Sequence, residues 1–176
     1  MGEVASGTPV VRARDCGPDE AVTHLYSAHY AGLVRLATML LHDQGRAEEI
    51  VQDAFVDVHG RWARLREPDK AVAYLRRAVV NRCRSELRHR KVVARHEPDS
   101  PGDDASAESH VLARAQRAQV LAALDALSGR QREVLILRYY LDLSESDIAA
   151  TLRISRGAVK SHSSRGIAAL RTTWEH

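Results

Sequence analysis

The sequence has few aromatic residues, two cysteines and no long apolar run. Aromatic residues make up 5% of the 176 positions, so the core has to be built from Ala, Val, Leu and Ile, a mixture that favours helices over a β-sandwich. Cys16 and Cys83 alone cannot provide a disulfide framework. No apolar run approaches the roughly 18 residues of a membrane span, and the first twenty residues lack the apolar segment of a secretory signal. We therefore expect a globular helical protein located in the cytoplasm.

The residue patterns of an enzyme or a metal site are also missing from the sequence. There is no Gly-rich phosphate loop and no paired-carboxylate motif. His24 and His29 stand five positions apart, a poor helical pair for a metal, and the other histidines show no ligand spacing. Cys83 falls on the apolar side of a predicted helix, which indicates a core residue rather than a nucleophile. We expect no catalytic centre, no cofactor and no metal.

Charge is spread unevenly along the chain, although the net charge is only +3. Between Arg61 and Arg95, twelve Lys and Arg residues stand against three acids. His96 to Glu108 then contains five acids and no Lys or Arg. A basic block followed by an acidic block indicates two surfaces with different partners.

Apolar residues recur at helical spacing over most of the chain, and no segment alternates with the period of a strand. Helices are predicted over 19–41, 46–65, 70–95, 107–127, 128–140, 144–152 and 155–173. Residues 96–107 contain two Pro, one Gly and two Ser among several acids, a composition typical of a linker. The predicted fold class is all-α with two small domains. The expected parts are a flexible tail 1–18, a first domain 19–95, an acidic flexible linker 96–107 and a second domain 108–176.

The segment from Ser144 to Leu170 has the pattern of a helix-turn-helix. A short helix, a three-residue turn (Arg153–Ser155) and a longer helix follow one another, and each has apolar residues on one side. In such motifs the second helix lies in the DNA major groove. Residues that can contact bases or phosphates lie on the side of the last helix opposite the apolar one, namely Lys160, Ser161, Ser164, Arg165 and Arg171. Arg156 lies at the boundary near the N-terminus of that helix.

One stripe of the predicted third helix is almost entirely basic. Its members follow at spacings of three and four: Tyr74, Arg77, Asn81, Arg84, Arg88 and Lys91. Like charges at these spacings repel, so the stripe indicates a polyanionic partner and salt-dependent binding. An aromatic beside cations also suits single-stranded DNA. Trp62, between Arg61 and Arg64, fits the same interpretation, and it fits a core position equally well.

The predicted second helix has an acidic polar face, formed by Glu48, Glu49, Gln52, Asp53 and Asp57. Such a face would repel DNA. It is either an ordinary solvated surface or a docking surface for a basic protein, and the residues alone leave both interpretations open.

Three segments together resemble the conserved regions of bacterial sigma-70 factors. Ala47–Phe55 resembles region 2.2, Tyr74–Arg82 resembles region 2.4, and Leu127–Leu135 with Ser144–Leu170 resembles region 4. The chain is similar to the short, two-domain extracytoplasmic-function class, and most of all to its actinobacterial branch. The resemblance implies that the two domains are sigma domain 2 and sigma domain 4, and that the chain is an RNA polymerase sigma factor of a specialised regulon. The alternative is a stand-alone helix-turn-helix regulator, although no dimerisation zipper or ligand-sensing domain is visible.

The resemblance also implies partners and residue roles. Core RNA polymerase would bind through its β′ clamp helices to Glu48, Glu49, Val51, Gln52, Asp53 and Phe55. The promoter −10 element, double-stranded and then single-stranded, would contact Arg61, Trp62, Arg64, Arg66, Tyr74, Arg77, Asn81, Arg84, Arg88 and Lys91. The −35 element would contact the last helix through its six polar residues named above. The acidic linker would enter the cationic channel of the polymerase, the second domain would contact the β flap, and an anti-sigma factor is a further expected partner.

Three positions depart from the family pattern. Arg153 stands in the turn where the family usually has Gly, so we expect a left-handed backbone there at some cost. His162 and Gly166 stand where the family more often has Arg and Ala. Gly166 is expected to cost about 0.5–1 kcal/mol of helix stability relative to Ala.

Overall fold

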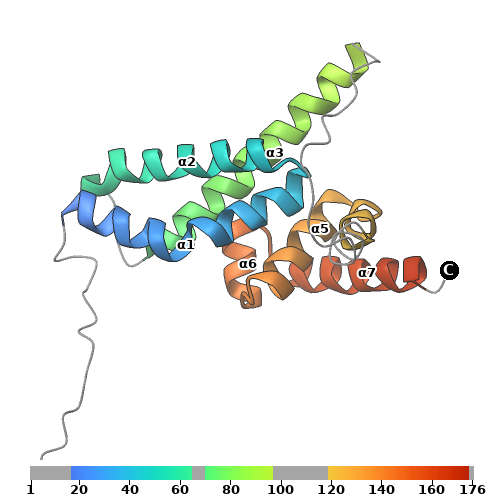
Figure 1. The fold of residues 1–176 in the computed structure, drawn as a ribbon. Coiled ribbons are helices and arrows are strands. Elements are labelled where there is room, and N and C mark those ends of the chain that lie inside the picture. Colours follow the sequence, from blue (N-terminus) through green and yellow to red (C-terminus); the bar gives the residue numbers. More distant parts are fainter. Residues whose placement is uncertain (1–16, 65–69, 97–118, 175–176) are drawn as a thin grey trace, which may run out of the picture.

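The computed structural model describes residues 17–64, 70–96 and 119–174, and every regular element in these ranges is a helix (Figure 1). The first half consists of α1 (Pro18–Leu41), α2 (Gln44–Arg61), a short 3-10 turn (Trp62–Arg64) and α3 (Ala71–His96). The second half begins with helical residues 119–125 and continues with α5 (Gly129–Leu135), a π-helical turn (Ile136–Tyr140), α6 (Glu145–Leu152) and α7 (Arg156–Trp174). Residues 1–16 of the predicted tail, residues 97–107 of the predicted linker and Arg66 lie outside the described residues, whereas Pro18 and His96 belong to α1 and α3. No described helix is long and apolar enough to span a membrane.

The turn between α1 and α2 is shorter than predicted, because a side chain caps α2 early. His42 adopts a left-handed backbone (φ 56°) and donates its N–H to the Thr38 carbonyl at 2.8 Å, which ends α1. The Asp43 carboxylate accepts a hydrogen bond from the Arg46 N–H at 2.9 Å. Asp43 is therefore the N-cap, and the helix begins at Gln44 rather than at residue 46. It ends at Arg61 rather than at residue 65.

Serine residues start the helices of the second half, as the sequence predicts. Ser128 and Gln131 form a reciprocal capping box at α5. Ser144 accepts from the Asp147 N–H at 3.1 Å, and Ser155 accepts from the Ala158 N–H at 3.1 Å. Arg153 is left-handed (φ 54°), which confirms the expected conformation of the helix-turn-helix turn.

Gly166 has a packing role that the sequence analysis did not foresee. It is buried where α7 crosses α5, and a Cβ added there would lie 2.9 Å from Leu135 Cδ1 and 3.2 Å from Leu135 Cγ. Glycine thus allows the two helices to approach closely, which offsets its poor helix propensity.

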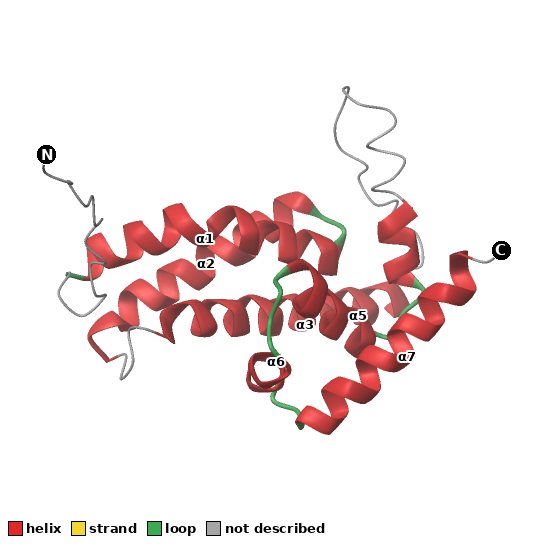
Figure 2. Ribbon diagram, turned by 90° about the horizontal axis from the view of Figure 1, so that it is seen from below, coloured by secondary structure: helices red, strands yellow, loops and turns green. Residues whose placement is uncertain are grey.

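The two halves pack directly on each other (Figure 2). Helix α3 lies against α6, and α1 lies against the π-helical turn. Their buried apolar residues join in one cluster: Leu36, Leu75 and Val79 from the first half, and Leu137, Ile148 and Leu152 from the second, are each no more than 1% exposed. The two predicted domains therefore share an interface rather than lying apart.

Candidate functional site

Helix α7 presents a polar, basic face to solvent. Arg156, Lys160, Ser164, Arg165 and Arg171 are exposed, whereas Ser161 is half-buried. The opposite side of the helix is anchored by Val159, at 0% exposed, and by Ser163, at 5%. The predicted division of this helix into an inner and an outer side is thus present in the structure.

A groove beside α7 includes two residues that the sequence analysis missed. Arg138 and Tyr139, from the π-helical turn, line it together with Lys160, Ser164 and Arg171. Tyr139 is 64% exposed, and the Arg138 guanidinium lies 6.0 Å from the centre of its ring. The sequence did offer a clue to this surface, because Arg138 and Tyr139 are adjacent at the end of the helix predicted over 128–140. Arg138 also lies 3.3 Å from Glu145 of α6, so the pair extends the polar surface beyond α7 with its charge partly neutralised.

The acidic face of α2 is solvent-facing, but not all of the residues expected to bind polymerase reach the surface. Glu49, Gln52 and Asp53 are exposed and Glu48 is half-buried. Val51 and Phe55 are 0% and 4% exposed, so in this arrangement they support the face from beneath instead of forming it.

An aromatic cluster beneath the acidic face holds α2 against α1. The ring of Phe55 lies 5.1 Å from that of Tyr26 and 6.3 Å from that of Tyr30. Val56, which the sequence analysis missed, is 70% exposed on α2, at helical spacing from Gln52 and Asp53. The surface therefore has an apolar side chain among polar ones.

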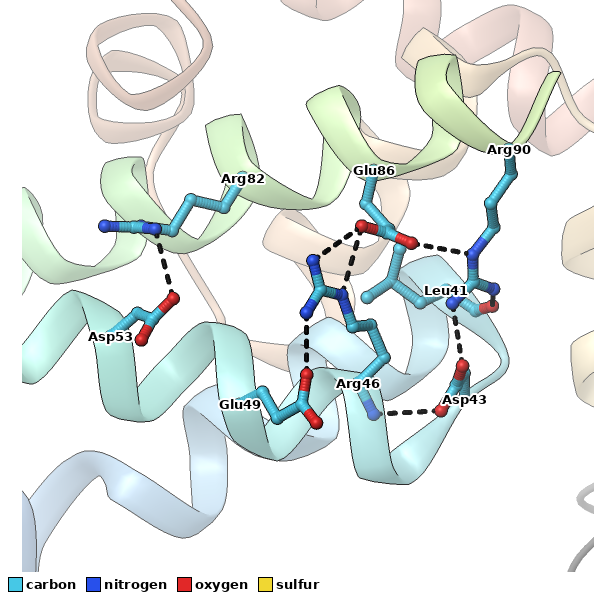
Figure 3. A network of polar contacts seen from close by, with 8 residues as sticks. All are labelled: Leu41, Asp43, Arg46, Glu49, Asp53, Arg82, Glu86 and Arg90. Atoms are coloured by element: carbon cyan, nitrogen blue, oxygen red, sulfur yellow. Dashed lines mark hydrogen bonds and ion pairs between the residues drawn. The ribbon is translucent and has the colours of Figure 1, made fainter. Parts of the chain in front are cut away.

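A network of ion pairs connects α2 with α3 along the edge of the acidic face (Figure 3). Glu86 accepts from Arg46 at 2.9 Å and from Arg90 at 3.1 Å, and Arg90 also reaches Asp43 at 2.7 Å. Burial alone would raise the pKa of Glu86, but the hydrogen bonds and charges of Arg46 and Arg90 outweigh it and lower that pKa. The network fixes the relative position of the acidic helix and the basic helix.

Arginines on this side of α3 face protein carboxylates. Arg82 lies 2.6 Å from Asp57 and 3.4 Å from Asp53. Arg82 and Arg90 therefore belong to the network between the helices, and the predicted DNA stripe, which includes neither, lies on a different side of α3.

The predicted −10 stripe of α3 is divided into open and covered parts. Tyr74, Asn81, Arg88 and Lys91 are exposed, as are Arg61 and Arg64. Arg84 is largely covered, with its side chain 21% exposed and paired with Glu133 of α5. Tyr74 and Arg77 line a pocket with Asp147, Ala150 and Thr151 of α6.

Trp62 and Cys83 are core residues. Trp62 is 8% exposed, which favours the core alternative that the sequence left open. Cys83 is 1% exposed, and burial raises the pKa of its thiol to about 12. A thiol with such a pKa is a poor nucleophile at neutral pH, in agreement with the core position predicted for it.

Comparison with known proteins places this arrangement in a family. Residues 25–92 match the family model of sigma-70 region 2, and residues 117–170 match that of sigma-70 region 4. The chain belongs to the sigma-70 family. The RNA polymerase sigma-E factor of Streptomyces coelicolor is 37% identical over 142 residues, 79% of this chain and 77% of that protein. The extracytoplasmic-function sigma factor SigL of Mycobacterium tuberculosis is 33% identical over 157 residues, 85% of this chain and 86% of that protein.

Two solved structures show the same fold. CnrH, in complex with the cytosolic domain of CnrY, superposes with a TM-score of 0.71 at 24% identity, over 93% of this chain and 92% of that chain. The sigma factor RpoE in complex with the anti-sigma factor NepR from Bartonella quintana gives 0.71 at 22% identity, over 89% and 96%. The family resemblance, the all-α fold and the sigma-factor function predicted from the sequence are thereby confirmed, and the stand-alone regulator is not supported.

Proposed function

We propose that three surfaces of this sigma factor bind three different partners during transcription initiation. The exposed face of α7 enters the major groove of the −35 element, the basic stripe of α3 binds the −10 element, and the acidic face of α2 docks on the β′ clamp helices of core RNA polymerase. The observation that carries the proposal is the composition of α7, which has no acidic residue in 19 positions and exposes four cationic side chains. Such a helix in a helix-turn-helix is suited to DNA.

The exposed part of the α3 stripe supports binding to melted DNA. Arg88 and Lys91 are exposed cations suited to phosphates, and Tyr74, at 41% exposed, offers a ring on which an unpaired base can stack. Extruding a base from the duplex costs a few kcal/mol. Stacking and phosphate contacts offset this cost, so promoter melting uses binding energy and requires no catalytic centre in this chain.

The acidic face of α2 has the composition of a protein–protein interface. Exposed Val56 lies among Glu49, Gln52 and Asp53, so an apolar contact is surrounded by polar groups. Its negative charge is complementary to a basic partner surface, which favours docking over an ordinary solvated face.

Further partners are proposed from the family. The acidic linker 96–107 enters the cationic channel of the polymerase, and the second domain contacts the β flap through an apolar surface. An anti-sigma factor binds the chain when its regulon is silent, by analogy with the RpoE–NepR complex. The protein acts in the cytoplasm, where its promoters and the polymerase are.

The proposal is tested by run-off transcription with actinobacterial core RNA polymerase on a genomic promoter library. Discrete new transcripts that share a two-part upstream element are expected when the protein is added. Salt-sensitive duplex binding without any transcript would instead indicate a stand-alone regulator.

Two variants and a control test whether the polymerase-binding surface and the DNA-binding surface are distinct. Asp53→Lys should abolish binding to core polymerase, whereas Glu20→Lys, an equal charge change at an exposed position of α1, should leave it intact. Arg88→Glu combined with Lys91→Glu should retain polymerase binding and lose promoter opening. Loss of polymerase binding in that double variant would overturn the division into an acidic and a basic surface.

A further inference from the structure

A small pocket between α3 and α6 is rich in positive charge. Figure 2 shows α6 lying against α3. The pocket between these helices has a volume of about 180 Å³, and the polar residues that line it are Lys70, Tyr74, Arg76 and Arg77 from the first half and Asp147 and Thr151 from the second. Three cations therefore share this space with one carboxylate.

Two arginines of the pocket lack the carboxylate partners that the other half-buried arginines have. Ion pairs with carboxylates are formed by Arg82, Arg84, Arg90, Arg132 and Arg138. Arg76 and Arg77 are half-buried as well, yet neither makes a hydrogen bond or an ion pair with any residue that the structure describes. A guanidinium that has lost part of its hydration without gaining an acceptor favours a further anion beside it.

The carboxylate that lines the pocket does not supply this anion. The Ser144 hydroxyl donates to Asp147 Oδ2 at 2.6 Å, so that oxygen is already engaged at the start of α6. Burial lowers the pKa of Arg76 more than the charge of Asp147 raises it. On the α1 side, burial and then the charge of Arg76 lower the pKa of His29, so His29 is neutral at neutral pH and adds no negative charge. The charge of Arg76 is therefore only partly compensated.

A hydroxyl on α6 adds a further donor to the pocket. Thr151 is 4% exposed, and its hydroxyl makes no hydrogen bond with any of the described residues. Every fully buried polar side-chain atom in the described ranges has a partner. The Thr151 oxygen therefore keeps contact with solvent, which reaches it through the pocket that this residue lines. Such a hydroxyl can donate to an oxygen of a ligand.

The size and the lining of the pocket favour a small oxyanion. Guanidinium groups bind the oxygens of phosphate through paired, charge-assisted hydrogen bonds. The volume of about 180 Å³ is below the roughly 300–1,000 Å³ of pockets that hold drug-sized ligands. A single phosphate group matches both the donors and the space.

We propose that this pocket is a binding site for a small, free phosphate ion, held by Arg76 and Arg77 of α3 and by the Thr151 hydroxyl of α6. The ion contacts residues of both halves, so it stabilises their packing by mass action. Arg76 and Thr151 belong to none of the three surfaces proposed above. The inference therefore does not depend on the role of α3 in DNA binding.

Titration of inorganic phosphate into the full chain at constant ionic strength tests the proposal. Calorimetry should show one saturable site with a Kd of about 0.1–1 mM, within the limit set by so few ligand atoms. At about ten times this Kd, phosphate should raise Tm by about 3–5 °C relative to sodium chloride of equal ionic strength. Arg76→Gln should weaken phosphate binding at least about tenfold, and Thr151→Val about fivefold.

Matched variants show whether these side chains bind the ion directly. Arg153→Gln makes the same charge change at an exposed position directly after α6, outside the pocket, and should bind phosphate as the wild type does. Thr151→Ser retains the hydroxyl and should keep the affinity that Thr151→Val loses, which a merely structural role would not produce. Thr151→Val preserves the shape of the side chain and keeps the test decisive if Arg76→Gln does not fold.

A second probe distinguishes a free ion from the backbone of DNA. A short fluorescein-labelled single strand should bind the Arg76→Gln variant within about twofold of the wild type, because Arg76 lies outside the proposed DNA stripe. Failure of phosphate to bind the folded wild type would overturn the proposal, as would unchanged phosphate affinity in folded Arg76→Gln and Thr151→Val. Loss of DNA binding in Arg76→Gln, without any phosphate binding to the wild type, would assign Arg76 to the DNA surface instead and leave the proposed function in place.

Discussion

Replacing Gly166 with Ala tests whether helix propensity or packing dominates the stability of the protein at this position. By propensity alone, Ala should stabilise α7 by about 0.5–1 kcal/mol. In the structure, the new Cβ would lie 2.9 Å from Leu135 Cδ1, well inside the 3.5–4.0 Å of an ordinary carbon contact. Leu135 is 4% exposed and has little room to move. Overpacking of this kind costs about 1–3 kcal/mol, so we expect a net loss of about 1 kcal/mol.

Thermal and urea unfolding of the full chain measure this effect against a matched control. The loss should lower Tm by about 2–4 °C in a chain of this size. Gly32→Ala in the middle of α1, where a Cβ would meet nothing within 4 Å, should instead be stabilising. In a Leu135→Ala background, Gly166→Ala should also become stabilising, because its steric partner is gone. If Gly166→Ala raises Tm as much as Gly32→Ala does, the packing argument is wrong.

Three further predictions concern caps, burial and pH. Ser128→Ala removes the capping box and should lower the free energy of unfolding by about 1 kcal/mol in urea titrations. In a Cys16→Ser background, Cys83 should resist a thiol reagent at pH 8 until denaturant is added, since its pKa is about 12; rapid labelling of the native chain would contradict its burial. The pKa values of Glu86 and Asp43 are lowered in the folded state. The two ionised carboxylates therefore stabilise the fold at pH values above their ordinary pKa values of 4.5 and 3.8. This stabilisation is lost as pH falls through the lower pKa values of the folded state. Glu86→Gln should reduce this acid dependence of stability, and an unchanged pH profile would show that the network contributes nothing.

Much of the local structure could be predicted because its causes lie within a few residues. Ser128 and Gln131 are three positions apart, and their capping box is visible in the sequence. The left-handed backbone of Arg153 was expected because the family usually has Gly at that position of the turn. Helix boundaries were less predictable, since α2 begins at Gln44, capped by Asp43, although Gly45 had suggested a break there.

The surfaces were only partly predictable because burial depends on which helices meet. Periodicity placed Val51 and Phe55 on the apolar side of α2, and the family resemblance placed both within the polymerase-binding segment. Both are buried. Conversely, Val56 and Tyr139 are exposed although they are large and apolar or aromatic. A sequence pattern indicates that a helix has two faces, and only the neighbouring helices decide where the edge of the buried face lies.

By itself, the sequence determined the helices, the helix-turn-helix, the division into basic and acidic surfaces and the family, because spacing, caps and charge are properties of neighbouring residues. The tertiary structure decided what covers those surfaces. Arg84 and Glu133 are 49 positions apart, and Arg35 and Tyr140 are 105 apart. Contacts at such separations arise only when the two halves pack, and Gly166 meets Leu135 only where α7 crosses α5, so both features are visible only in the folded chain.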